Sequence, residues 1–260
     1  MIKVSVVGAG GRMGREVCRA VLAEHDLELV AAIDPGFSGR SLGELAGDPR
    51  ARLMVQSDLG AMAAAGAQVM VDFTQPASAY VDALFALEHS IHAVVGTTGI
   101  SPGELEELER RAADASSNLL IAPNFAMGAV LMMVFARQAA RYFPDCEIIE
   151  LHHDRKLDTP SGTSLRTAEM IAESRKGGSS GAGEQSSSRG LDVQGIRVHS
   201  VRLPGLIAHQ EVVFGSAGQA LTIRHDSYDR SSFMPGVIYA VRNVGAHAGM
   251  TVGLEKWLSL

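Results

Sequence analysis

The segment that decides the fold is Ile2-Lys-Val-Ser-Val-Val-Gly8-Ala-Gly10-Gly11-Arg12-Met13-Gly14. A short Val-rich run ends in glycines, and helical periodicity follows over residues 11–24. The glycines are spaced as Gly8-x-x-Gly11-x-x-Gly14, which departs from the usual dinucleotide spacing because residue 13 is Met. Glycines at a strand-to-helix turn let the backbone approach a pyrophosphate, and the helix N-terminus offers N–H groups and a favourable dipole. The segment therefore predicts a nucleotide-binding turn.

An acidic residue lies where such a turn requires one. A second apolar strand over residues 28–34 ends at Asp34, about 20 residues past Gly14, where a carboxylate can accept hydrogen bonds from ribose hydroxyls. Asp34 favours NADH over NADPH because it would repel a 2′-phosphate. Arg12 and Arg15 could offset that charge, so the choice between the two cofactors stays open.

The first half of the chain continues this alternation of strands and helices. Strand candidates at 68–73, 91–95 and 118–121 are separated by helical stretches at 76–88 and 101–114. This order indicates a Rossmann-like, doubly wound parallel sheet, and apolar strands without alternation fit burial on both faces.

Three later turns follow strands of that sheet, at the edge where open α/β sheets bind ligands. They are Asp72-Phe73-Thr74, Gly96-Thr97-Thr98-Gly99 and Ala122-Pro123-Asn124-Phe125. Together they predict the wall of a nicotinamide pocket.

The pattern changes after Asn124. A Met- and Ala-rich helix at 125–142, a strand at 146–152, a helix at 162–174 and three alternating runs within 196–227 precede a closing helix at 232–247. We predict a dinucleotide-binding domain at 1–123, completed by 233–260. A substrate-binding and oligomerisation domain at 124–232, of α+β class with a mixed or antiparallel sheet, would be joined to it by hinges near 124 and 232. The Gly- and Ser-rich residues 176–190 predict a mobile surface loop.

Bulk properties exclude several classes of protein. The net charge of −6 and pI of about 5.8 argue against a general attraction to nucleic acid. No apolar run reaches membrane-spanning length, and the start has the pattern of a strand rather than a signal peptide, so we expect a cytoplasmic protein. Cys18 and Cys146 are expected to be buried thiols, and their spacing suggests no metal site.

The richest chemistry lies in Glu150-Leu-His152-His153-Asp-Arg-Lys156-Leu-Asp-Thr-Pro160-Ser161-Gly162-Thr163. Adjacent strand residues point to opposite faces, so one histidine can reach a pocket while the other braces it. Histidine suits proton transfer near neutral pH, and Lys156 supplies a positive charge. Ser161-Gly162-Thr163 offer hydroxyls and N–H groups at a helix start, which suits an anion. A metal site is disfavoured because adjacent histidines cannot easily share one ion.

This segment closely resembles the signature of the dihydrodipicolinate reductase (4-hydroxy-tetrahydrodipicolinate reductase) family, which most often has Ala at the position of Thr159. The glycine turn, Asp72-Phe-Thr, Gly96-Thr-Thr98, Ala122–Phe125 and the domain order are similar too, so the resemblance covers the whole chain. It implies hydride transfer from NADH or NADPH to a cyclic imine dicarboxylate in the diaminopimelate route to lysine. It also implies a homotetramer built through the sheet of the second domain.

The resemblance also implies roles for individual residues. His152 would be the proton donor and acceptor, Lys156 a second proton donor, and His153 a substrate contact. Gly162 and Thr163 would bind a substrate carboxylate, beside the hydroxyl of Ser161. In relatives with an arginine after the acidic ribose contact, that arginine helps to bind NADPH, whereas Pro35 stands here. The cofactor contacts would be Gly8, Ala9, Gly10, Gly11, Arg12, Met13, Asp34, Gly96, Thr97, Thr98, Ala122, Pro123, Asn124 and Phe125.

Two other functions fit part of this pattern. Another two-domain dehydrogenase acting on an amino or hydroxy acid would share the glycine turn but has no need of the His-His-x-x-Lys segment. A regulator that binds NAD(H) without turnover would need a nucleic-acid or partner surface, against which the net charge argues. Arg230 is a further candidate for closing over the substrate.

Overall fold

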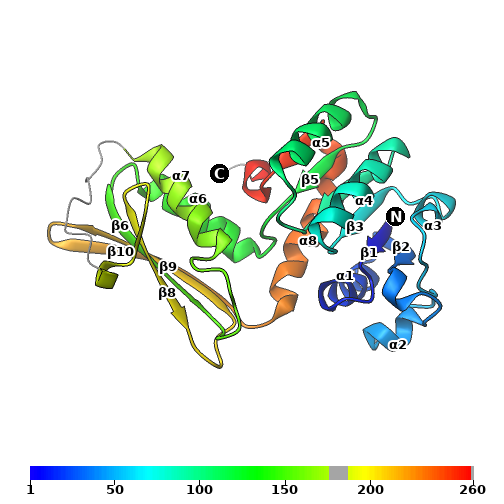
Figure 1. Ribbon diagram of the computed structural model, residues 1–260, viewed down its shortest axis with the longest axis horizontal. Coiled ribbons are helices and arrows are strands. Elements are labelled where there is room, and N and C mark those ends of the chain that lie inside the picture. Colours follow the sequence, from blue (N-terminus) through cyan, green and yellow to red (C-terminus); the bar gives the residue numbers. More distant parts are fainter. Residues whose placement is uncertain (176–186, 259–260) are drawn as a thin grey trace. The chain divides into compact units, whose positions relative to one another are not determined.

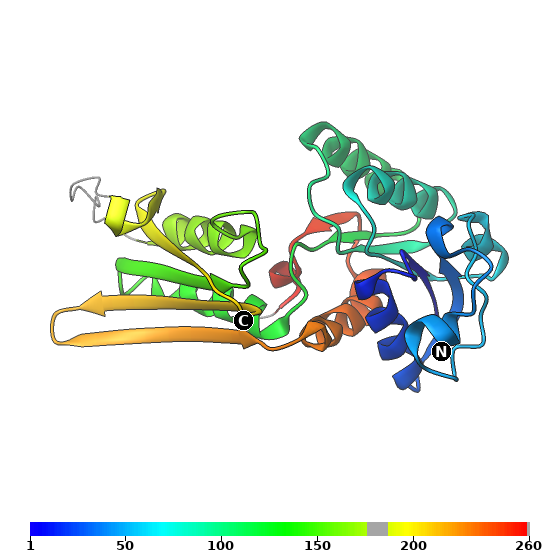
Figure 2. The same ribbon diagram turned by 60° about the horizontal axis from the view of Figure 1, so that its bottom comes forward.

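A computed structural model describes residues 1–175 and 187–258 of the chain (Figures 1 and 2). Two compact units are present: Met1–Phe125 together with the segment that begins at Phe233, and Ala126–Ser232. Most of the loop predicted at 176–190 lies outside the described residues. No helix within the described ranges is long and apolar enough to cross a membrane.

The first unit is built on a six-stranded sheet in which every pairing is parallel. The strand order is β11-β5-β4-β3-β1-β2, which confirms the predicted doubly wound sheet. The order reverses between β1 and β3, and ligands bind such sheets beyond the carboxyl ends of the strands at this reversal. The strands are β1 (Ile2–Val7), β2 (Leu27–Ile33), β3 (Val69–Asp72), β4 (His92–Val95), β5 (Leu119–Ile121) and β11 (Met250–Val252).

Helices cover both faces of this sheet. One face carries α4 (Pro76–Glu88) and α5 (Pro102–Asp114), with the short α3 (Gly60–Ala64) beside them. The other face carries α1 (Arg12–Ala23) and α8 (Met234–Asn243), which pack against each other. A short α2 (Leu42–Ala46) precedes α3. The helix predicted at 232–247 is thus shorter and is flanked by 3-10 turns at Arg230–Phe233 and Val244–Ala246.

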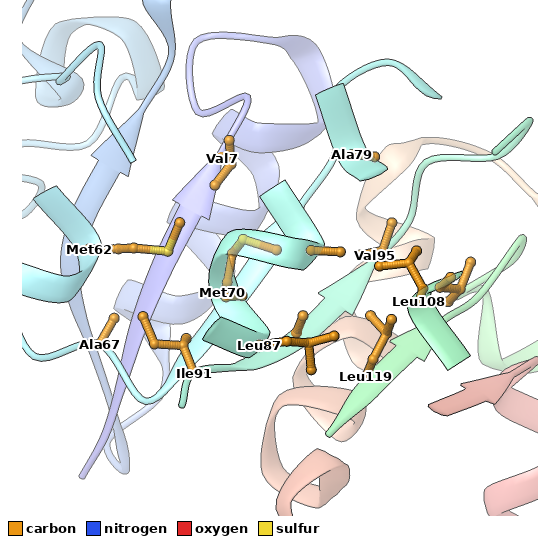
Figure 3. Packing of buried hydrophobic residues seen from close by; sticks show 14 of the residues in the cluster. Val7, Met62, Ala67, Met70, Ala79, Leu87, Ile91, Val95, Leu108 and Leu119 are labelled. Atoms are coloured by element: carbon orange, nitrogen blue, oxygen red, sulfur yellow. The ribbon is translucent and has the colours of Figure 1, made fainter. Parts of the chain in front are cut away.

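The core between the sheet and α3, α4 and α5 holds this unit together (Figure 3). Met62 of α3, Leu87 of α4 and Leu108 of α5 meet the strand residues Met70 and Leu119, and all five are at most 5% exposed. Burying such side chains stabilises the fold by about 2 kcal/mol each. The core therefore fixes the strand ends from which the loops of the candidate site emerge.

The second unit contains a five-stranded sheet in the order β10-β9-β6-β8-β7. β6 and β8 run parallel and the other neighbours antiparallel, so the sheet is mixed. The helices α6 (Met127–Ala139) and α7 (Gly162–Ser174) pack together and against the sheet. The helix predicted at 125–142 is thus shorter. The strands are β6 (Asp145–His152), β7 (Leu191–Val193), β8 (Ile196–Arg202), β9 (Ala208–Ser216) and β10 (Gln219–Ser227).

The two cysteines differ in burial. Cys18 lies buried on α1, and burial raises the pKa of its thiol to about 12. Cys146 is only half-buried on β6, so the expectation of a buried thiol was wrong for it. Burial still raises the pKa of Cys146 to about 12, which leaves the thiol protonated at neutral pH.

Candidate active site

The glycine turn connects β1 to α1 in a tight bend. Gly8 has a φ of +77°, and a Cβ there would lie 2.8 Å from the carbonyl oxygen of Phe73. A Cβ on Gly14 would lie 2.1 Å from the carbonyl oxygen of Gly8, so only glycine lets α1 start this close to the turn. Gly11 is the N-cap and offers no side-chain cap. The first N–H groups of α1 are therefore directed at a position that suits a phosphate, and the turn fits a dinucleotide.

The structure places Asp34 against this turn. One oxygen of its carboxylate, Oδ2, accepts a hydrogen bond from the Gly10 N–H at 3.0 Å, and the other, Oδ1, accepts one from the Gly36 N–H at 3.0 Å. The acid is thereby held beside the glycines with lone pairs remaining for further donors. This position fits the contact to ribose hydroxyls that the sequence predicts.

Two arginines accompany an aromatic ring near Asp34. The Phe37 ring lies over Gly10, and the guanidinium carbons of Arg15 and Arg40 lie 5.4 and 5.8 Å from its centroid. Arg15 also donates to the Gly10 carbonyl at 2.7 Å, while Arg12 is exposed. The sequence pattern pointed to Arg15, but not to Phe37 or Arg40, because these two residues reach the glycine turn only through the fold of the loop after Asp34.

Phe73 joins the three later turns to the glycine turn. Its carbonyl contacts Gly8, and a Cβ on Gly96 would lie 2.1 Å from its ring. Its ring centroid is 5.8 Å from that of Phe125. The turns after β1, β3, β4 and β5 are thus in contact through Phe73. Thr98 and Pro123 are exposed on it and Gly96 and Asn124 half-exposed, whereas Ala9, Thr97, Ala122 and Phe125 are buried.

The Asp72 carboxylate connects two of these turns. Its Oδ1 accepts hydrogen bonds from the Thr97 hydroxyl at 2.9 Å and from the Thr74 N–H at 3.2 Å, and its Oδ2 accepts one from the Thr74 hydroxyl at 2.9 Å. Asp72 is completely buried at the end of β3.

In the second unit, His152 is the last residue of β6 and is held by Glu150 of the same strand. The two residues are two positions apart, so their side chains lie on one face of the sheet. The His152 Nδ1 lies 2.5 Å from the Glu150 Oε2. Glu150 is completely buried, and Arg202 of β8 donates to both of its oxygens. The parallel register pairs His152 with Arg202.

The charge state of Glu150 follows from its partners. Burial raises the pKa of this carboxyl, but the hydrogen bonds from His152, Arg202 and Ser200 outweigh burial and lower it to about 2. Glu150 therefore stays ionised near neutral pH. Because an ionised carboxylate only accepts hydrogen bonds, the His152 Nδ1 must carry a proton, and its Nε2 is left for exchange.

Lys156 lies in the turn that follows β6. Its Nζ is 2.7 Å from the Asp158 Oδ2, and Arg202 donates to the Asp158 carbonyl at 2.8 Å. Arg202 thus contacts the partners of both His152 and Lys156. His153 is half-buried, and its buried Nδ1 has no hydrogen-bond partner within the described part of the chain.

Ser161 forms the N-cap of α7. Its hydroxyl accepts from the Ser164 N–H at 3.2 Å and lies 2.8 Å from the Ser164 hydroxyl, which donates to Gln210 at 2.8 Å. Ser161 is only 3% exposed, so its hydroxyl serves the helix. Gly162 and Thr163 begin α7 and are exposed and half-exposed, so the first turn of the helix faces outward.

Besides Phe37 and Arg40, three further residues were not predicted to contribute, one in the first unit and two in the second. Phe73 was noted only as part of a turn, and Glu150 and Arg202 were assigned no role. Glu150 carries a usable signal, because a carboxylate two positions before a strand histidine shares its face. Arg202 carries none, because its contact depends on the register between β6 and β8. Arg230 begins the 3-10 turn before α8 and is exposed. The described residues contain no group of three or more His, Cys, Asp or Glu side chains that could hold a metal ion.

Comparison with known proteins covers both units. Residues 2–125 match the family described as dihydrodipicolinate reductase, N-terminus, and residues 128–258 match dihydrodipicolinate reductase, C-terminus. The 4-hydroxy-tetrahydrodipicolinate reductase of Listeria innocua is 50% identical over 99% of this chain and 100% of the relative. That of Corynebacterium diphtheriae is 49% identical over 100% of this chain and 99% of the relative.

Solved structures agree with these matches. Dipicolinate-bound dihydrodipicolinate reductase from Paenisporosarcina sp. TG-14 is 40% identical with a TM-score of 0.85, over 99% of this chain and 100% of that chain. An amine dehydrogenase from Mycobacterium smegmatis, 14% identical with a TM-score of 0.71 over 98% and 95% of the two chains, shares the fold alone.

Proposed function

The chain belongs to the dihydrodipicolinate reductase family, and from that premise we propose how its residues carry out the family's reaction. It is an oxidoreductase that uses a pyridine nucleotide to reduce 4-hydroxy-tetrahydrodipicolinate in lysine biosynthesis. In our proposal, dehydration gives the conjugated cyclic imine dihydrodipicolinate, and NADH or NADPH supplies the hydride. Protonation from His152 then yields tetrahydrodipicolinate.

The contact between His152 and Glu150 carries this proposal. Hydride addition to a conjugated imine leaves an enamine-like carbanion, which must receive a proton at the adjacent carbon. The 2.5 Å contact holds Nδ1 of His152 on Glu150, so Nε2 holds and delivers the proton. Arg202 keeps Glu150 ionised in its buried position, which prevents the imidazole from rotating away.

The substrate carboxylates need cationic or N–H-rich contacts. We assign one to the first turn of α7 at Gly162 and Thr163, with Ser161 shaping that turn through its cap. Lys156 is the second proton donor, oriented by Asp158, and His153 contacts the substrate. The dipicolinate bound in the solved relative is itself a cyclic dicarboxylate, which supports this assignment.

The cofactor contacts lie in the first unit. In the proposal, Gly8, Ala9, Gly10, Gly11, Arg12 and Met13 hold the pyrophosphate, Asp34 the ribose, and Gly96, Thr97, Thr98 and Ala122–Phe125 the nicotinamide side. We propose that NADH and NADPH are both used, because Asp34 can accept from ribose hydroxyls while Arg15 and Arg40 flank the Phe37 ring beside this turn and can offer positive charge to a 2′-phosphate.

The protein is further proposed to act as a cytoplasmic homotetramer assembled through the sheet of the second unit. Ile149, Leu151 and Val213 are half-buried residues that alternate with buried ones such as Ile148 and Val212 along β6 and β9. A second sheet packed on their face would complete their burial. Light scattering of the purified protein tests this assembly, and a monomeric mass would contradict it.

The decisive experiment is a coupled assay. Dihydrodipicolinate synthase generates the substrate, and oxidation of NADH or NADPH is followed by absorbance. We expect oxidation that depends on the synthase product with either cofactor. Reduction of NAD+ or NADP+ by an amino or hydroxy acid, with no oxidation of NADH or NADPH by that product, would instead support the other two-domain dehydrogenases.

A further inference from the structure

The first unit contains a buried carboxyl pair that the reaction above does not use. Asp72 ends β3 and is completely buried, and Asp82, on α4, is 6% exposed. The two side chains hydrogen-bond to each other. One carboxyl must therefore carry a proton, because a hydrogen bond between carboxyls needs a donor and two contacting carboxylates in a dry environment repel strongly.

The surroundings decide which carboxyl holds the proton. Burial raises the pKa of Asp72 too, but Asp72 also accepts hydrogen bonds from Thr74 and Thr97, which favour its charged form. Burial and then the hydrogen bond and charge of Asp72 raise the pKa of Asp82 to about 8. Among the described residues, α4 packs most closely against α5, β4 and β3, and the charge that raises the pKa of Asp82 is that of Asp72 on β3. The charge thus rests on Asp72 and the proton on Asp82.

The carboxyl pair lies beside the turns that follow β3 and β4. Thr74 and Thr97 belong to the turns after β3 and β4, and the Phe73 ring between them rests on Gly96. The Asp72 carboxylate holds both turns in place, and Asp82 supplies a hydrogen-bond donor to its other side. A second negative charge on α4 would push the helix away from the end of β3 that these turns share.

We propose that Asp82 is a positioning residue for the pyridine nucleotide, whose donated proton fixes Asp72 and the turns of Thr74 and Thr97, so that ionisation of Asp82 weakens cofactor binding. This inference rests on the proposed contact of the cofactor with these turns. No covalent step is involved. The proton simply leaves to solvent as the pH rises.

The test compares wild type with Asp82→Asn. The asparagine amide donates to Asp72 as the protonated acid does but cannot ionise. The dissociation constants of NADH and NADPH are measured by fluorescence titration across the pH range around the titration of the pair. For wild type we expect both dissociation constants to rise about tenfold per pH unit once the pH exceeds the pKa of Asp82. For Asp82→Asn we expect the low-pH affinity to persist, with kcat at saturating cofactor unchanged. Parallel pH profiles for the two proteins would overturn the proposal.

A structural readout tests the shared proton separately. Because the pKa of Asp82 is raised on folding, the folded state binds the extra proton, and wild type loses stability as the pH rises from about 4 towards 8. Asp82→Asn should lack this loss and exceed wild type in stability near the upper end. If Asp82→Asn is less stable than wild type near pH 8, the conclusion that Asp82 shares its proton with Asp72 is wrong.

Two further results keep the inference distinct from the proposed function. Infrared spectroscopy of wild type alone should show a protonated carboxyl band that disappears over the pH range in which cofactor affinity falls, and this needs no variant. A band that disappears without any change in affinity would overturn the positioning role. Failure of substrate turnover would contradict the proposed function and leave the binding profiles unaffected.

Discussion

Arg202 binds Glu150 through two parallel hydrogen bonds, from Nη1 to Oε2 at 2.8 Å and from Nη2 to Oε1 at 2.7 Å. The Glu150 carboxylate also accepts a hydrogen bond from His152 Nδ1. This buried anion therefore binds both the Arg202 guanidinium and the proposed proton donor, His152. A bidentate guanidinium–carboxylate pair fixes orientation as well as charge. The direction of the imidazole is therefore set by β8 as well as by its own strand.

Glu150→Gln should destabilise the protein and change its response to acid. Removing the carboxylate leaves the Arg202 charge without its partner, which we expect to cost about 3 kcal/mol at neutral pH. Because the pKa of Glu150 is lowered on folding, wild type loses its contribution as the pH falls from about 4.5 to 2. Chemical unfolding across this range should show a weaker pH dependence for the variant. Glu107→Gln, at an exposed ion pair of α5, is the control and should change little.

His152→Gln should lower kcat by about a hundredfold or more while leaving KM for the substrate nearly unchanged. Glutamine cannot deliver a proton, yet it preserves most of the size and polarity of the side chain. Steady-state kinetics give both constants. His199→Gln is a matched control, because His199 also pairs with a glutamate of β6, Glu147, at 2.7 Å. Equal losses in the two variants would contradict the special role of His152.

Lys156→Ala should remove most activity, because the second proton donor and its charge are both lost. Substrate-dependent oxidation of the cofactor measures the effect. The exposed Lys256 provides the control variant Lys256→Ala, for which we expect wild-type rates. Wild-type turnover in Lys156→Ala would contradict the proposed role.

Gly14→Ala should disrupt the glycine turn, because the added Cβ would lie 2.1 Å from the Gly8 carbonyl oxygen. We expect a loss of stability of about 3 kcal/mol and weaker cofactor binding, measured by urea unfolding and fluorescence titration. Gly103→Ala in α5 is the control, since a Cβ there meets nothing within 4 Å. That variant should be as stable as wild type or slightly more so.

The double variant Arg15→Ala/Arg40→Ala should raise KM for NADPH about tenfold and KM for NADH much less. Both guanidinium groups lie beside Phe37, next to Asp34, where a 2′-phosphate would need positive charge. Initial rates with each cofactor test this, and Arg110→Ala on α5 serves as the control. An equal effect on both cofactors would show that the arginines act on the fold of the turn instead.

The sequence allowed most of the fold to be predicted because its elements carry strong local patterns. The helices at Pro76–Glu88 and Gly162–Ser174 were predicted with these bounds, since Pro76 occupies the first helical position and Ser161 caps the other helix. β11 was missed because three residues between Gly249 and Gly253 show no periodicity. That strand forms only because β5 offers a free edge to it.

The site was less predictable than the fold. The candidate residues from His152 to Thr163 are close together in the sequence, so their chemical roles could be predicted from the sequence alone. Contacts made through register or packing could not be, such as Arg202 with Glu150 across 52 positions, or Phe73 against Gly96. These residues have ordinary local patterns, and only the paired strands give them a role.

The position of β11 has a consequence for biosynthesis. The sheet of the first unit gains its last strand only when Met250–Val252 pairs with β5, and α8 must also arrive to cover one face. A nascent chain emerging from the ribosome thus holds all of Ala126–Ser232 before the first unit can be finished. The inserted unit can fold first during translation, while the nucleotide-binding unit closes last. Chains released early by premature termination near residue 230 would therefore carry an uncovered sheet and be prone to degradation.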